Sequence, residues 1–305
     1  MRRFIPLLFA AAAGCSSAAS VSTGKPAIVA TTGMIGDAAR IIGGPHVDVH
    51  VMMGPGIDPH QYKATAGDLR RMQSAKLVLY NGLHLEGKMA DVFESMGKRT
   101  KTVAVTHSLN PQTELRTAAE GYEGTHDPHV WFDVSLWMKC VGAVRDALCE
   151  LDPAHAADFQ TNADAYLKEL ASLHDEVNTK AASIPKERRV LITAHDAFYY
   201  FGRAYGFEVR GLQGISTASE PSTRDVQELA KLIGERKLPA IFGETSVPDR
   251  NIQAVRDAVT KGYGFEVKFV GERLYSDALG NAGTPAGTYA GMVRHNIDAM
   301  TEALK

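Results

Sequence analysis

Residues 154–184 read AHAADFQTNADAYLKELASLHDEVNTKAASI, a stretch that contains neither glycine nor proline. Pro153 precedes it and Pro185 follows it. Alanine, leucine, glutamate and lysine recur in this stretch, and all four are strong helix formers. The stretch therefore predicts one helix of about 30 residues, roughly 45 Å long at 1.5 Å per residue. A helix of that length is unusual inside a globular domain, so we expect it to join two lobes of similar size.

The segments on both sides of this helix alternate short apolar runs with helical patterns. Four strands are expected before it, at 27–32, 47–53, 77–80 and 102–106, and four after it, at 189–193, 207–212, 240–243 and 265–270. Strands that alternate with helices predict parallel sheets covered on both faces. We therefore expect an α/β fold of two (β/α)4 lobes with mostly parallel sheets, joined by one long connecting helix. The expected parts are a leader (1–24), an N-terminal lobe (25–152), the connecting helix (153–184) and a C-terminal lobe (185–305).

The N-terminal leader has the pattern of an export signal. Met1-Arg2-Arg3 is basic, and the apolar run at 4–13 is too short to cross a bilayer as a helix. Ala12-Ala13-Gly14-Cys15 is similar to a bacterial lipobox, in which the cysteine carries a lipid. We expect a periplasmic or other extracytoplasmic protein anchored through Cys15, with 16–24 as a flexible tether. Ordinary signal cleavage near these alanines is the alternative.

The overall composition does not favour a nucleic-acid partner. The chain has 305 residues, of which 45% are hydrophobic, and its formal net charge is −2. No block of like charge forms the basic arm or stripe that nucleic-acid binding requires. The length suggests two domains, each with enough apolar residues for a core.

Four residues from distant parts of the chain are candidate metal ligands: His60, His129, His195 and Asp277. The first two occur in a repeated tripeptide, as Asp58-Pro59-His60 and Asp127-Pro128-His129. Proline restricts its own φ and the backbone of the preceding residue, so each histidine follows a stiffened segment. The other two candidates come soon after predicted strands, and parallel sheets bind ligands beyond the carboxyl ends of their strands.

Three imidazoles and one carboxylate make a chemically reasonable metal site. Such a set can hold zinc in a tetrahedron, and the carboxylate also suits manganese, with iron as a further possibility. The set forms no local motif, so ordinary core or surface roles for the histidines stay open on the residues alone. Glu244, which ends a buried strand, could orient a ligand histidine through its ring N–H. A helix cap or a salt bridge between lobes is an equally open role for it.

Four motifs, in order along the chain, resemble the ligand loops of one family of transport proteins. The motifs are Gly56–Tyr62, Asp127–Asp133, Thr193–Phe201 and Leu274–Gly280. They resemble the cluster A-I (TroA-like) substrate-binding proteins of zinc and manganese ABC transporters, and the likeness extends over about 25–304. The resemblance implies a metal ion at the interface of the two lobes, with His60, His129, His195 and Asp277 as its ligands. It also implies delivery of zinc or manganese, possibly Fe²⁺, to a membrane permease and its ATPase.

The sequence departs from both metal-specific patterns of that family. Members tied to manganese often carry glutamate where this chain has His195, and zinc-restricted members usually have a histidine-rich loop, whereas 108–125 contains no histidine. We favour zinc slightly over manganese, with iron third. We expect a monomer without enzymatic activity. The alternatives are a zinc hydrolase, which would keep one metal position open for water, and a surface adhesin.

Overall fold

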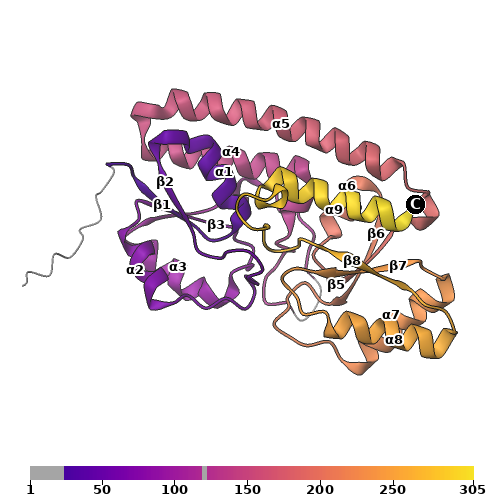
Figure 1. Ribbon diagram of the computed structural model, residues 1–305. Coiled ribbons are helices and arrows are strands. Elements are labelled where there is room, and N and C mark those ends of the chain that lie inside the picture. Colours follow the sequence, from indigo (N-terminus) through magenta and orange to yellow (C-terminus); the bar gives the residue numbers. More distant parts are fainter. Residues whose placement is uncertain (1–23, 119–121) are drawn as a thin grey trace, which may run out of the picture.

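Two groups of strands lie side by side in the computed structural model, and the long helix α5 (Ala156–Ala182) runs along both of them (Figure 1). The structure describes residues 24–118 and 122–305, so Cys15 and the rest of the leader lie outside the described residues. Helix α5 has 27 residues, slightly fewer than expected, because Pro153 opens a separate 3-10 turn over Pro153–His155. Its buried residues recur every three or four positions, which gives the helix one apolar face: Phe159, Ala163, Tyr166, Leu170, Leu173, Val177 and Ala181.

The N-terminal lobe contains one parallel sheet with the strand order β2-β1-β3-β4. Its strands are β1 (Ala27–Ala30), β2 (Asp48–Val51), β3 (Leu77–Tyr80) and β4 (Lys101–Ala104). Its helices are α1 (Gly33–Gly43), α2 (Ala66–Ser74), α3 (Ala90–Met96) and α4 (Val134–Leu151). Leu77 and Leu79 pack in the core that contains α1 and α4, whereas Val78 packs on the opposite face with residues of α2 and α3. The sheet is therefore covered on both faces, as the alternation along the sequence predicts.

The strands of the C-terminal lobe are also parallel, but they do not form one continuous hydrogen-bonded sheet. β5 (Val190–His195) pairs with β6 (Glu208–Gln213), and β7 (Ala240–Glu244) pairs with β8 (Lys268–Leu274), as two separate two-stranded sheets. β5 and β7 lie next to each other between the two pairs. The helices of this lobe are α6 (Tyr199–Tyr205), α7 (Thr223–Arg236), α8 (Arg250–Tyr263) and α9 (Tyr289–Leu304). The mixed α/β class with parallel sheets and one long helix is confirmed.

Several element boundaries differ from the sequence-based expectation. Between β3 and β4, a 3-10 turn (Gly87–Met89) directly precedes the short α3. The last strand starts at Lys268 rather than 265. α8 ends at Tyr263, and its C-cap Gly264 has a φ of +69°, the left-handed conformation that glycine adopts readily. His195 is the final residue of β5 rather than part of the following loop.

The largest apolar cluster is shared by the two lobes. The largest hydrophobic cluster contains α1 and α4 residues, one face of α5, and side chains from β5, α6 and α9. The backbone N–H of Tyr289, at the start of α9, donates to Asp37 Oδ2 on α1 at 2.8 Å. This shared core predicts that the lobes move little relative to each other. Within the described residues, no helix combines the length and the apolar character needed to cross a membrane.

Candidate metal centre

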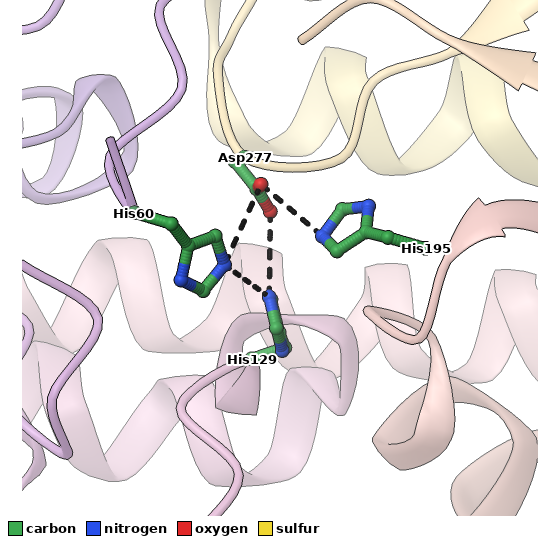
Figure 2. A group of neighbouring side chains, drawn as sticks. All are labelled: His60, His129, His195 and Asp277. Atoms are coloured by element: carbon green, nitrogen blue, oxygen red, sulfur yellow. Dashed lines mark hydrogen bonds and ion pairs between the residues drawn. The ribbon is translucent and has the colours of Figure 1, made fainter. Parts of the chain in front are cut away.

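Four buried side chains converge between the lobes, and they are the four that the sequence singles out: His60, His129, His195 and Asp277 (Figure 2). One ligand atom of each lies within 4.8 Å of the others. They arrive from four different segments. His60 lies in the loop after β2, and His129 precedes the 3-10 turn Val130–Phe132. His195 ends β5, and Asp277 lies in the loop after β8.

The spacing of the donor atoms suits a small divalent cation. Nε2 of His60 lies 3.2 Å from Nε2 of His129. Asp277 Oδ2 lies 3.2 Å from His195 Nε2, and Asp277 Oδ1 lies 3.6 Å from His129 Nε2. Four donors placed about 2.0–2.1 Å from one tetrahedral zinc ion are about 3.3 Å apart. The observed separations therefore leave room for one ion at the centre, with both carboxylate oxygens turned towards it.

Several of these atoms have no hydrogen-bond partner of their own. Among the described residues, His195 Nε2 and both carboxylate oxygens of Asp277 are buried and make no hydrogen bond of normal geometry, although Asp277 Oδ2 lies within ion-pair distance of His195 Nε2. Buried polar atoms almost always make hydrogen bonds in folded proteins, so three such atoms without one in the same place require an explanation. A cation bound at the centre would satisfy all of them at once.

Both Asp-Pro-His tripeptides use the aspartate to hold the backbone of the histidine. Asp58 Oδ1 accepts a hydrogen bond from the N–H of His60 at 2.9 Å, and Asp127 Oδ1 accepts one from the N–H of His129 at 3.0 Å. This is a turn closed by an aspartate side chain two residues before the donor. The proline alone does not provide this constraint. The repeated aspartate was the signal that could have revealed this second constraint.

His129 is held through its ring as well as its backbone. Its Nδ1 lies 2.8 Å from Asp127 Oδ1, so the ring donates there and leaves Nε2 free for the centre. Trp131 meets the His129 ring edge to face at 5.2 Å between centroids. The indole Nε1–H of Trp131 donates to the carbonyl oxygen of Ser276 at 3.1 Å, next to Asp277. Trp131 thereby connects the loops of two candidate ligands.

His195 is held by the buried carboxylate of Glu244 at the end of β7. Glu244 Oε1 accepts from the backbone N–H of His195 at 2.9 Å, and Glu244 Oε2 lies 2.5 Å from Nδ1 of the ring. This contact lies within the C-terminal lobe, and it points Nε2 of His195 at the centre. It is the geometry of a carboxylate that orients a metal-binding histidine.

The pKa values of three of these side chains, His60, His195 and Asp277, are shifted in different ways. Burial lowers the pKa of His60 to about 3. Burial also opposes the charge of His195, but the carboxylates of Glu244 and Asp277 overcome it and raise the pKa of this imidazole well above its ordinary value. For Asp277, burial alone would raise the pKa, whereas neighbouring His195 and the other two imidazoles bring it below its usual range. Without metal, the two carboxylates therefore favour a proton on His195, whereas burial favours the neutral form of His60.

A cavity of about 450 Å³ between the lobes leads to the centre. Of the four converging side chains, His60 alone lines it. The remaining lining comes from both lobes and includes His84, Tyr122, Gln213, Ile215 and Glu220. Water and ions therefore meet His60 before they meet the other three side chains.

Comparison with known proteins places this architecture in a family. A family model described as "Zinc-uptake complex component A periplasmic" (ZnuA) matches residues 28–303. The zinc-binding protein TroA of Treponema pallidum is 52% identical over 285 residues, which cover 93% of this chain and 91% of TroA. The manganese-binding lipoprotein MntA of Bacillus subtilis is 47% identical over 293 residues, 96% of this chain and 94% of MntA.

The fold agrees with these sequence matches. The solved structure of the periplasmic zinc-binding protein TroA from Treponema pallidum superposes with a TM-score of 0.88, covering 92% of this chain and 99% of that one. Family model, relatives and fold agree over nearly all of the described chain. The chain belongs to the ZnuA family, the periplasmic A components of zinc-uptake complexes.

Proposed function

We propose that this chain is the extracytoplasmic solute-binding component of an ABC importer. It captures a divalent transition metal ion and delivers it to a membrane permease driven by an ATPase. The observation that carries the proposal is the convergence of four buried side chains, three of whose inward-facing atoms make no hydrogen bond of normal geometry. Membership of the ZnuA family supports the transport role.

In this proposal His60, His129, His195 and Asp277 bind the ion directly, and Glu244 orients His195. The ion replaces the proton of His195 and offsets the buried charge of Asp277. Each histidine binds through Nε2, which is the ring nitrogen that faces the centre. The carboxylate completes the set with one oxygen or with both.

Zinc is the first choice of cargo, manganese the second and iron the third. Three imidazole nitrogens favour zinc by ligand softness. The two inward oxygens of Asp277 would also allow a five-coordinate manganese ion. The printed names of the relatives include both metals, zinc for TroA and manganese for MntA.

We also propose that the mature protein is a monomer anchored by a lipid on Cys15, with 16–24 as its tether. MntA of Bacillus subtilis is named a lipoprotein, which supports this anchoring. The proposed parts are lobes at 25–152 and 185–305 with the connecting helix at 153–184.

A zinc hydrolase is the less favoured role for this centre. Catalytic zinc keeps a position open for water, usually beside three protein ligands. Here Asp277 supplies a fourth protein donor, and all four side chains are buried. We therefore propose a binding protein without catalytic activity.

The test combines elemental analysis of the purified full chain with metal-dependent melting. A ligand at 100 times its Kd stabilises the folded state by about 2.7 kcal/mol, so zinc should raise the Tm of the wild type. His60→Ala should lose this increment. His107→Ala, at an exposed position outside the cluster, is the matched control and should keep it. A wild type without zinc or manganese, or a His60→Ala variant with an unchanged shift, would contradict the proposal.

A further inference from the structure

Arg116 connects the loops that carry two of the proposed ligands. Its Nη1 lies 3.2 Å from Asp127 Oδ2 and 2.7 Å from Asp196 Oδ2. Asp127 belongs to the N-terminal lobe and holds His129, whereas Asp196 directly follows His195 in the C-terminal lobe. One guanidinium nitrogen therefore bridges two carboxylates that lie beside different ligands in different lobes.

The backbone of Arg116 takes part in the same network. Its N–H donates to the hydroxyl of Tyr200 at 3.1 Å, and that hydroxyl donates to the carbonyl oxygen of Asp127 at 2.8 Å. The guanidinium also lies over the ring of Tyr199, 4.3 Å from its centroid. Tyr199 and Tyr200 both belong to α6, which follows the His195 strand. The position of Arg116 is thus determined by both lobes.

The charge of Arg116 matters because of where Asp127 lies. The Asp127 side chain is fully buried, and its Oδ1 already accepts from the backbone and the ring of His129. Its Oδ2 meets Arg116, whose side chain is only 24% exposed. A buried carboxylate that loses its cation loses its main compensation, and the groups it holds lose their fixed orientation.

A contact beside His60 differs in kind from the Arg116 bridge. Thr217, in the C-terminal lobe, donates its hydroxyl to Asp58 Oδ2 at 2.5 Å, beside His60. Its carbonyl oxygen accepts from Gln61 Nε2 at 3.2 Å. Both donors in this contact are neutral, and it adjoins the ligand that lines the cavity. The cationic bridge of Arg116 instead adjoins the two ligands that lie away from that cavity.

We propose that Arg116 is a positioning residue for metal retention, an inference that rests on the proposed function. Its cation holds the His129 and His195 loops at a fixed separation, so that the ion leaves only when the His60 side of the centre opens. Loss of the cation allows those two loops to separate and adds a second way to release the ion. The effect should be seen mainly in the dissociation rate.

The experiment measures zinc release from the loaded full chain into an excess of chelator, together with equilibrium affinity. Loss of an outer group that orients a ligand typically weakens metal affinity about 10–100-fold, and Arg116→Gln should do so through faster release. Arg116→Lys should recover most of the retention, because both carboxylates contact the same nitrogen of Arg116. Arg203→Gln is the matched control, since Arg203 lies over Tyr200, the neighbouring tyrosine of α6, but contacts neither Asp127 nor Asp196.

Melting of the metal-free variants separates this role from a purely structural one. If Arg116→Gln folds poorly, Asp196→Asn removes only the C-terminal end of the bridge and should still speed release. Unchanged release in both variants, or equally fast release in Arg203→Gln, would overturn the inference. If a folded Arg116→Lys variant released zinc as fast as Arg116→Gln, the positive charge of Arg116 would not be what retains the ion. A wild type that binds no zinc would overturn the proposed function itself.

Discussion

The tripeptides Asp58-Pro59-His60 and Asp127-Pro128-His129 are identical in sequence but lie in different surroundings. In both, the aspartate accepts the backbone N–H of the histidine, at 2.9 and 3.0 Å. Beyond that bond they diverge. Asp127 also holds the ring of His129, whereas Asp58 uses its second oxygen for Thr217 in the other lobe.

The two histidines differ accordingly. His129 is completely buried and has its ring fixed by a carboxylate. His60 borders the cavity, and no carboxylate is bonded to its Nδ1 within the described residues. The same local motif therefore supplies one rigid ligand and one ligand at the accessible side. We infer that metal ions arrive and leave past His60.

The largest expected effect comes from removing the carboxylate that makes this difference. Asp127→Asn should weaken metal affinity by about 10–100-fold, because the neutral amide orients His129 less well. Asp58→Asn should cost clearly less, since Asp58 holds only the backbone of His60. Calorimetric titration with zinc would compare the two. Equal losses of zinc affinity would mean that the two aspartates contribute equally to metal binding.

The next largest effect is a pH dependence of stability and metal affinity, to which His195 should contribute and His60 should not. The raised pKa of His195 stabilises the metal-free fold below the usual imidazole value of about 6.5, and this stabilisation is lost as the pH rises through the raised pKa. Metal needs the neutral imidazole, so binding releases a proton and affinity falls about tenfold per pH unit while His195 is protonated. His60, with a pKa of about 3, should release none near neutrality.

Titrations in buffers of different ionisation enthalpy would count the protons released. About one proton per ion is expected for the wild type between pH 6 and 7. The Glu244→Gln variant should release fewer protons per ion than the wild type, because one of the two carboxylates that raise the pKa of His195 is gone. Release that is unaffected by this substitution would assign the proton to a different group.

The smallest effect concerns the shape of the molecule. The lobes share one apolar core along α5, so access past His60 requires a local change rather than a large closure. X-ray scattering curves of the metal-free and zinc-loaded protein should nearly superimpose. A compaction of the whole molecule on metal binding would show instead that both tripeptides move as parts of rigid lobes.

Much of the fold could be predicted from local patterns. The order of strands and helices, the parallel sheets and the long helix are confirmed, and Asp133 caps α4 by accepting from the N–H groups of Ser135 and Leu136. The division of the C-terminal strands into two pairs could not be predicted. Strand pairing depends on partners far away in the chain, whereas periodicity reports only on a window of neighbouring residues.

The candidate site, too, could be predicted only in part. The motifs identified the four converging side chains, and their role as ligands stays a prediction that metal analysis must test. Nothing in the sequence around Arg116 or Thr217 marks either residue as part of the site. Their importance arises only where loops of different lobes meet, because hydrogen bonds and ion pairs act over a few ångströms in space whatever the separation in sequence.

By itself, the sequence determined the element order, the long connecting helix and which residue types could bind a metal, since these depend on local propensity and side-chain chemistry. The tertiary structure alone decided which histidine is enclosed and which one borders the cavity. The physical reason is that burial and the neighbouring charges, which set the pKa and the mobility of an imidazole, come from segments distant in the chain.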